Sequence, residues 1–124
     1  MGKALILVVD DLATERICLR KILDKNGFDV IEATNGKDGV ELAKEKRPNL
    51  ILMDVVMPDV NGFQALRMVK KKDSGITDIP VIMVTTKDRD PDKMNAQDNG
   101  AFGYVVKPAS EAALMPQINS ALSL

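Results

Sequence analysis

Residues 5 to 11 of the chain read LILVVDD, five apolar residues followed directly by Asp10 and Asp11. An unbroken apolar run of this length is typical of a strand covered on both faces, as in a parallel sheet between two layers of helices. Two adjacent carboxylates at its end are costly, because unit charges about 4 Å apart repel by about 4 kcal/mol at an effective dielectric near 20. The stretch therefore predicts a buried strand and raises the question of why two like charges stand at its carboxyl end.

The size and charge of the chain limit what it can be. Its 124 residues, 45% of them hydrophobic, fit one domain over residues 1–124. Seventeen basic residues against eighteen acidic ones leave a formal net charge of -1, so no nucleic-acid footprint is visible. No segment approaches the roughly 18 apolar residues of a membrane span. We expect a soluble monomer without membrane insertion, whose partner is a protein or a small ion.

Two residue counts narrow the chemistry. The chain has no histidine, which excludes Ser-His-Asp catalysis, the common zinc sites and a phosphohistidine relay on this chain. Cys18 is the only cysteine, so an internal disulfide is impossible and a reducing, cytoplasmic compartment fits. Because Cys18 falls among Ile17, Leu19 and Ile22, we expect a small buried hydrophobic side chain there. Any chemistry must run on carboxylates, hydroxyls and lysines.

Short apolar runs alternate with amphipathic stretches along the whole chain. This alternation is typical of βα units around a doubly wound parallel sheet in an α/β protein. Four of the five runs are almost unbroken, whereas residues 28–32 alternate more and suit a sheet edge. The runs are Ala4 to Val9, Phe28 to Glu32, Leu50 to Met53, Val81 to Val84 and Phe102 to Val106.

The stretches between the strands carry helix-end signals. Gly27 and Gly100 end the first and fourth, where a left-handed C-cap is wanted. Asn35-Gly36 marks a turn into the second helix. In the last helix Pro116 removes a backbone donor, which should kink the helix or delay its regular start.

The helix expected over residues 90–99 has clear start signals but few apolar residues to pack against the core. Asp90 is expected as the N-cap and Pro91 as the first helical residue. Only Met94 and Ala96 are apolar in this stretch. We therefore expect this helix to be weakly held.

Polar residues follow four of the five predicted strands. In a doubly wound sheet, ligands bind beyond the carboxyl ends of the strands. Three carboxylates at one edge would repel, and a hard cation such as magnesium, which takes oxygen ligands, relieves that repulsion. The residues that follow the strands are Asp10 and Asp11, Asp54, Thr85 and Thr86, and Lys107 with Pro108.

Each of these residues alone has a simpler interpretation. Asp10 and Asp11 can begin a loop or cap the helix from Ala13. Asp-Asp after a strand is a weak signal, as is the single Asp54. The simpler interpretation must then place three acids, a hydroxyl and a lysine at one edge by accident. We favour a functional site.

With these residues in place, the chain resembles a receiver domain of a two-component response regulator, of the single-domain, CheY-like kind, from end to end. The resemblance implies a flavodoxin-like fold, with a five-stranded parallel sheet in the order 2-1-3-4-5 and five helices. The stretches that carry it are Val8-Val9-Asp10-Asp11, residues 52–58 (LMDVVMP) with Gly62, Val84-Thr85-Thr86, and residues 103–108 (GYVVKP).

The resemblance implies a phosphoacceptor site with magnesium. Asp54 would accept a phosphoryl group from a histidine kinase or a histidine phosphotransfer protein, forming an acyl phosphate. Asp11, Asp54 and the backbone carbonyl of Val56 would bind magnesium directly, and Asp10 would act through water. The donor histidine would have to belong to another protein, since this chain has none.

The resemblance also implies a switch and an output. Lys107 would pair with Asp54 or with a phosphoryl oxygen, and Thr85 would hydrogen-bond the phosphoryl group. Tyr104, otherwise a half-buried strand residue with a solvated hydroxyl, matches the family's switch aromatic. The signal would pass to a downstream protein through the face around Asp90–Leu122.

Two narrower features qualify the likeness. Val56 stands where a polar residue is frequent, and Lys87 lies two places after the switch threonine.

Residues 62–65 (GFQA) together with 84–88 (VTTKD) are similar to regulators of type IV pilus twitching motility. A chemotaxis or motility pathway is therefore expected.

Two other classes of function compete with a signalling module. A magnesium-dependent phosphohydrolase with an aspartyl-phosphate intermediate would need substrate-binding elements, and the chain has no insertion to supply them. Turnover of a small phosphate ester would support it. The other rival is a constitutive binding domain of the same fold that has lost phosphorylation. The presence of all five site residues argues against it: Asp10, Asp11, Asp54, Thr85 and Lys107. We therefore expect a phosphoprotein that is not a small-molecule enzyme.

Overall fold

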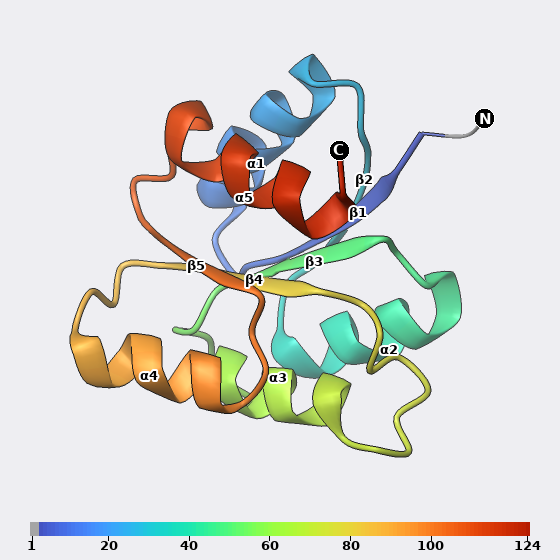
Figure 1. Cartoon of the computed structure of the whole chain (residues 1–124), viewed down its shortest axis with the longest axis vertical. Helices are drawn as coiled ribbons and strands as arrows, with labels where there is room; N and C mark the ends of the chain where they lie inside the picture. The colour runs from blue at the N-terminus through green and yellow to red at the C-terminus, as the bar shows by residue number, and fades with distance from the viewer. Residues whose placement is uncertain (1–2) are drawn as a thin grey trace.

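The computed structural model describes residues 3–124 as one five-stranded parallel sheet between two helical layers (Figure 1). The strand order is β2-β1-β3-β4-β5, which confirms the expected doubly wound fold. In chain order the elements are β1 (Leu5–Val9), α1 (Ala13–Lys25), β2 (Asp29–Ala33), α2 (Gly36–Lys46), β3 (Leu50–Met53), α3 (Gly62–Lys70), β4 (Val81–Thr85), α4 (Asp90–Asp98), β5 (Gly103–Val106) and α5 (Glu111–Leu122).

The apolar runs predict the strands to within one residue at either end. The three central strands β1, β3 and β4 are buried almost throughout, as a sheet covered on both faces requires. The edge strand β2 is less buried, with Asp29 and Glu32 exposed and only Ala33 buried, as suits a sheet edge. The buried runs therefore fix which strands lie in the middle.

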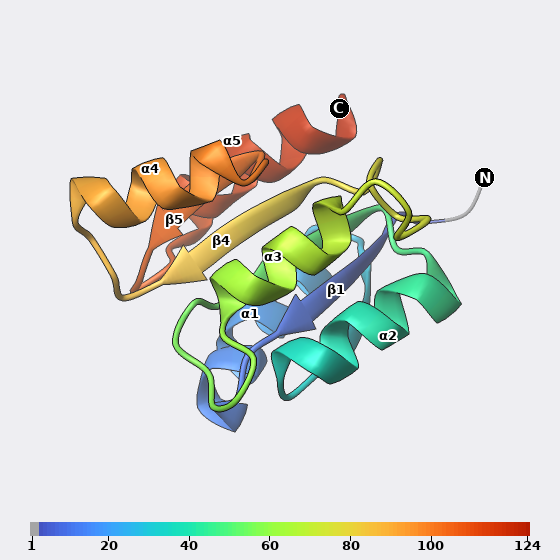
Figure 2. The same cartoon turned by 90° about the horizontal axis from the view of Figure 1, so that it is seen from below.

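Alternate residues of each strand feed two separate cores. In β1, Leu7 and Val9 pack toward α2, α3 and α4, whereas Ile6 and Val8 pack toward α1 and α5. Figure 2 shows α2, α3 and α4 side by side over one face of the sheet. None of the helices between residues 3 and 124 has the length and apolar character that crossing a membrane would need.

The helix ends agree with the sequence at the two glycines and differ at α4. Gly27 and Gly100 have positive φ values of 83° and 92°, as expected after a helix. The N-cap of α4 is Arg89 and not Asp90, because the Arg89 carbonyl already accepts hydrogen bonds from the amides of Asp92 and Lys93. Pro91 is accordingly the second helical residue. Arg89 provides no side-chain cap, so α4 begins less firmly than expected.

Three further expectations need correction or refinement. Met94 is 60% exposed, so Ala96 alone anchors α4 in the core. Cys18 is exposed and not buried, because the buried stripe of α1 runs through Leu19 and Leu23, and a neighbouring residue points about 100° away. The start of α5 is not delayed by Pro116, because the Ser110 hydroxyl caps the helix upstream by accepting from the Ala113 amide at 3.1 Å.

The start of α3 lies directly against the end of β3. Asn61 and Gln64 form a capping box, and the Gly62 amide donates to the Val55 carbonyl at 2.9 Å. A Cβ on Gly62 would overlap the Asp54 carbonyl oxygen and lie 2.7 Å from the Val55 Cα. Glycine is therefore what allows α3 to approach the backbone that carries Asp54.

We predict that Gly62→Ala lowers the free energy of unfolding by about 1–3 kcal/mol, because the added methyl group must displace backbone. An alanine in place of glycine inside a helix ordinarily stabilises by about 0.5–1 kcal/mol, so the expected sign is opposite to that of helix propensity. Urea unfolding measures the difference. Gly75→Ala is the comparison for backbone strain without overlap: its φ of 82° is unfavourable for alanine, which is not the case at Gly62, and nothing lies within 4 Å of its Cβ. An unchanged or increased free energy of unfolding in Gly62→Ala would contradict the packing argument.

Candidate functional site

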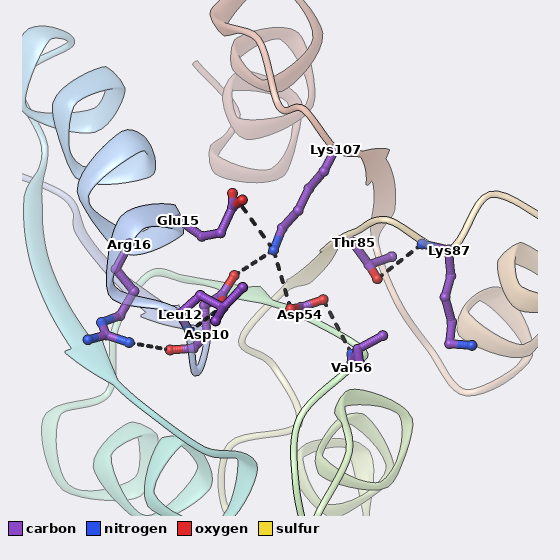
Figure 3. Close-up of polar contacts among 9 residues, drawn as sticks. All are labelled: Asp10, Leu12, Glu15, Arg16, Asp54, Val56, Thr85, Lys87 and Lys107. Atoms are coloured by element: carbon purple, nitrogen blue, oxygen red, sulfur yellow. Dashed lines mark hydrogen bonds and ion pairs between the residues drawn. The ribbon is translucent and has the colours of Figure 1, made fainter.

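Four side chains named from the sequence meet at the carboxyl edge of the sheet. Asp10, Asp54, Thr85 and Lys107 follow or end β1, β3, β4 and β5 (Figure 3). Because these strands lie side by side in the sheet, residues more than forty positions apart become neighbours. Asp10 is 1% exposed and Asp54 is 6% exposed, so both carboxylates are held away from water.

Asp10 is the most completely bonded residue of the site. Its amide donates to the Ala33 carbonyl at 3.1 Å, and its carbonyl accepts from Nη1 of Arg16 at 2.6 Å. One carboxylate oxygen accepts from the Leu12 amide at 2.9 Å and the other from Nζ of Lys107 at 2.7 Å. Asp10 therefore ties the turn after β1 to the rest of the site.

Lys107 is shared among three carboxylates. Its Nζ lies 2.7 Å from Asp10, 3.3 Å from Asp54 and 3.9 Å from Glu15. The sequence indicated Asp54 as its partner, and the structure adds a closer contact with Asp10. Burial lowers the pKa of Lys107, but the hydrogen bond to Asp10 and the charges of Asp54 and Asp10 outweigh it, so the pKa is raised. The ammonium group therefore stays charged at neutral pH.

Asp54 is a buried carboxylate held between two donors. One of its oxygens faces Lys107 and the other accepts from the Val56 amide at 3.3 Å. Burial raises the pKa of Asp54; the charge of Lys107 opposes this shift and the charge of Asp10 adds to it. The net rise means that the ionised form of Asp54 is disfavoured in the folded protein.

A third carboxylate completes an acidic cluster. One oxygen each of Asp10, Asp11 and Asp54 lies within 4.8 Å of the other two. Asp11 is exposed, whereas both oxygens of Asp10 already accept hydrogen bonds. A cluster of oxygen ligands with one exposed member fits a hard divalent cation that keeps several waters.

Thr85 and Tyr104 are connected through the loop that follows β4. Thr85 is buried, and its Oγ1 accepts from the Lys87 amide at 3.3 Å. The Tyr104 hydroxyl donates to the Lys87 carbonyl at 2.8 Å, so it is bonded and not merely solvated. Burial, with the charges of three aspartates, raises the pKa of Tyr104 to about 12, so the hydroxyl remains a donor at neutral pH.

Three contacting residues were not identified from the sequence. Glu15 and Arg16 lie in the first turn of α1 and reach Lys107 and the Asp10 carbonyl. Their position four and five residues after Asp11, at the start of the helix, was the available signal. Gln117 of α5 donates to the Tyr104 carbonyl at 3.0 Å, which no sequence pattern indicated.

The fold and the site together define a doubly wound α/β domain with a lysine-linked acidic cluster at the carboxyl edge of its sheet. The family model of the response regulator receiver domain matches residues 6–119. The chain belongs to the response regulator receiver family, whose function is phosphorylation-dependent signalling in two-component systems.

Individual relatives agree over nearly the whole chain. Protein PilH of Pseudomonas aeruginosa is 48% identical over 120 residues, which cover 97% of this chain and 98% of PilH. Chemotaxis protein CheY of Bacillus subtilis is 37% identical over 119 residues, covering 95% of this chain and 97% of CheY. The crystal structure of chemotaxis protein CheY4 of Vibrio cholerae superposes with a TM-score of 0.88 at 28% identity, covering 98% of this chain and all of CheY4.

We predict that Asp54→Asn raises the melting temperature of the metal-free protein at neutral pH. Because the pKa of Asp54 is raised above 3.8 by folding, its ionisation costs stability as pH rises through the folded-state pKa. Asparagine keeps the shape and removes that cost, and each kcal/mol gained is worth about 4 °C. Differential scanning calorimetry in EDTA tests this.

The gain should shrink as the pH falls toward 3.8, where aspartate in the unfolded chain is itself half protonated. A melting temperature for Asp54→Asn at or below that of the wild type at neutral pH would contradict the prediction. It would mean that the lost pairing with Lys107 outweighs the relief of repulsion.

Proposed function

We propose that the chain is a phosphorylation-controlled signalling module that accepts a phosphoryl group on Asp54 from a histidine kinase or a histidine phosphotransfer protein. The observation that carries this proposal is the position of Asp54, buried at the sheet edge between the Lys107 ammonium group and the Val56 amide. The chain has no histidine, so the phosphohistidine belongs to another protein. The domain is proposed to extend over residues 1–124.

In the transfer step a carboxylate oxygen of Asp54 attacks the phosphorus atom of the phosphohistidine. The new oxygen–phosphorus bond forms as the phosphorus–nitrogen bond breaks, and the imidazole leaves with the bonding electron pair and takes up a proton. Lys107 lies 3.3 Å from Asp54 and neutralises charge on the phosphoryl oxygens. Thr85 accepts a bond from the Lys87 amide, so its own hydroxyl hydrogen is available to donate to a phosphoryl oxygen.

The acidic cluster supports a magnesium site in this mechanism. Asp11, Asp54 and the Val56 carbonyl would be direct ligands. Asp10 would act through water, since both of its carboxylate oxygens are already bonded to Leu12 and Lys107. When bound, magnesium supplies neutralisation of the charge that builds up between carboxylates and phosphoryl oxygens.

We infer that the output is contact with a downstream protein through the face around Asp90–Leu122. Support comes from apolar side chains on this face: Met94 is 60% exposed and Phe102 is 49% exposed. A groove of about 300 Å³ lies between α4 and β5 and includes Phe102 and Tyr104 in its lining. The likeness to the chemotaxis protein CheY of Bacillus subtilis supports a role in a chemotaxis or motility pathway.

The proposal also covers substrate turnover, the cellular compartment and the oligomeric state. We propose that the module turns over no small molecule and hydrolyses only its own acyl phosphate. With a formal net charge of -1 and a single cysteine, it is proposed to act as a cytoplasmic monomer, without nucleic acid.

We predict that Asp54→Asn abolishes acyl-phosphate labelling by acetyl phosphate with magnesium, because the amide is not a nucleophile. Mass spectrometry of the intact protein detects the added phosphoryl group. Asp59→Asn is the matched control: it makes the same substitution five residues away at an exposed position. Its φ of 64° suits asparagine, so it should label like the wild type. Continued labelling of Asp54→Asn would refute Asp54 as the acceptor.

We also predict that the phosphate mimic beryllofluoride, with magnesium, changes amide hydrogen exchange most in residues 85–107. Thr85 should meet the mimic and shift the loop that bonds Tyr104 through the Lys87 carbonyl. The neighbouring α4 has one buried residue and should respond most easily.

Thr85→Ala should still bind the mimic but lose most of this exchange response. Thr86→Ala, one residue further along and exposed, is the control and should respond like the wild type. Exchange changes confined to the acidic cluster, with residues 85–107 silent, would rule out this switch.

A further inference from the structure

The turn that carries Asp10 and Asp11 joins β1 to α1 without an ordinary helix cap. Leu12 is the N-cap residue of α1 and has no side chain that can accept a hydrogen bond from the first turn. Two other bonds hold the turn instead. The Asp10 carboxylate accepts from the Leu12 amide at 2.9 Å, and the Asp10 carbonyl accepts from Arg16 at 2.6 Å.

Arg16 connects this turn to the edge strand β2. Its Nη1 binds the Asp10 carbonyl, while its Nε binds the Glu32 carboxylate at 3.2 Å. The side chain is only 16% exposed, and Figure 3 shows it directed at the backbone of Asp10. Glu32 is fixed in turn by the pairing of β2 with β1, where it lies opposite Val8. The Asp10 carbonyl is thus braced from a regular part of the sheet.

Arg20, one turn further along α1, provides a natural comparison. It binds the same Glu32 carboxylate through Nε at 3.1 Å and donates to the Val30 carbonyl at 3.2 Å. Its side chain is 41% exposed, and its hydrogen bonds do not include the turn at Asp10 and Asp11. The two arginines therefore share a partner and a charge but differ in their contact with the site.

We propose that Arg16 is a positioning residue, which fixes the peptide between Asp10 and Asp11 and so directs the Asp11 carboxylate toward the magnesium position. This inference rests on the magnesium site of the proposed function. Without Arg16, the Asp10 carbonyl loses this hydrogen bond. Because the peptide group is planar, rotation about the Cα–C bond of Asp10 then carries the Cα and Cβ of Asp11 with it. Arginine suits the task because two separate N–H groups reach Glu32 and the carbonyl together.

Charge and positioning make opposite predictions for the loss of Arg16. Removing a cation from beside an acidic cluster should strengthen magnesium binding if charge alone matters. Removing the brace should weaken it, because partners that orient metal ligands typically change metal affinity by about 10–100-fold. The sign of the change therefore separates the two effects.

The test is isothermal titration of MgCl2 into the wild type, Arg16→Met, Arg20→Met and Asp11→Ala, with thermal unfolding in EDTA as the check on folding. We expect the Kd for magnesium to rise about tenfold in Arg16→Met. Arg20→Met loses the same charge and the same partner, so its Kd should be unchanged or lower. Asp11→Ala, which removes a proposed ligand, sets the scale of a full loss.

Each outcome bears on one proposal. Magnesium binding by Arg16→Met that equals or exceeds the wild type overturns the positioning role, as does an equal loss in Arg20→Met. No magnesium binding by the wild type contradicts the metal site itself, which is a different failure. If Arg16→Met does not fold, Arg16→Lys replaces it: one ammonium group cannot serve Glu32 and the carbonyl together, so its Kd should rise at least about threefold. Wild-type affinity in Arg16→Lys would also overturn the proposal.

Discussion

The ammonium group of Lys107 offsets the repulsion among the carboxylates at the carboxyl edge of this sheet. Asp10, Asp11 and Asp54 bring oxygens within 4.8 Å of one another, and Lys107 bonds the two buried ones. Because the strands are parallel and paired in one sheet, the residues that follow them are fixed at the same edge. The carboxylates therefore cannot move apart to reduce their repulsion. Burial, and to a smaller extent the charge of Asp10, still raises the pKa of Asp54, so the cluster favours a further positive charge. Under the proposed function, magnesium would supply that charge beside the phosphoryl group.

The strands and the main site residues could be predicted because they depend on local sequence. A buried strand must be apolar throughout, and whatever follows it lies at the carboxyl edge. What could not be predicted depends on the direction of side chains in three dimensions. The exposure of Cys18 is set by which stripe of α1 faces the sheet, and the bond from Lys107 to Asp10 by the distance between β5 and β1 across the rim. The hydrogen bond from Arg16 to the Asp10 carbonyl likewise exists only once α1 is docked.

The two sides of the site differ in how firmly they are held. Toward β1 and β2, every polar group of Asp10 is bonded, and Arg16 ties its carbonyl to the sheet. Toward β4 and β5, a 3.3 Å bond from the Lys87 amide is the only hydrogen bond of the Thr85 side chain among residues 3–124. The next helix in that direction, α4, has a weak start and one buried residue. The β4 side is therefore the softer one.

Under the proposed function, this asymmetry would decide which elements respond to phosphorylation of Asp54. A shift from 1:99 to 99:1 between two conformations needs about 5.5 kcal/mol of differential interaction, which a hydrogen bond and an ion pair can supply only in part. This free energy moves most easily the element that is held by the fewest interactions. On the β1 side, a movement would break several hydrogen bonds at once. On the β4 side, a movement need only replace the hydrogen bond from the Lys87 amide to the Thr85 hydroxyl. The carbonyl of the same Lys87 accepts a hydrogen bond from the Tyr104 hydroxyl. Under the proposed function, a rigid acceptor side and a more mobile output side would let phosphorylation of Asp54 change the position of α4.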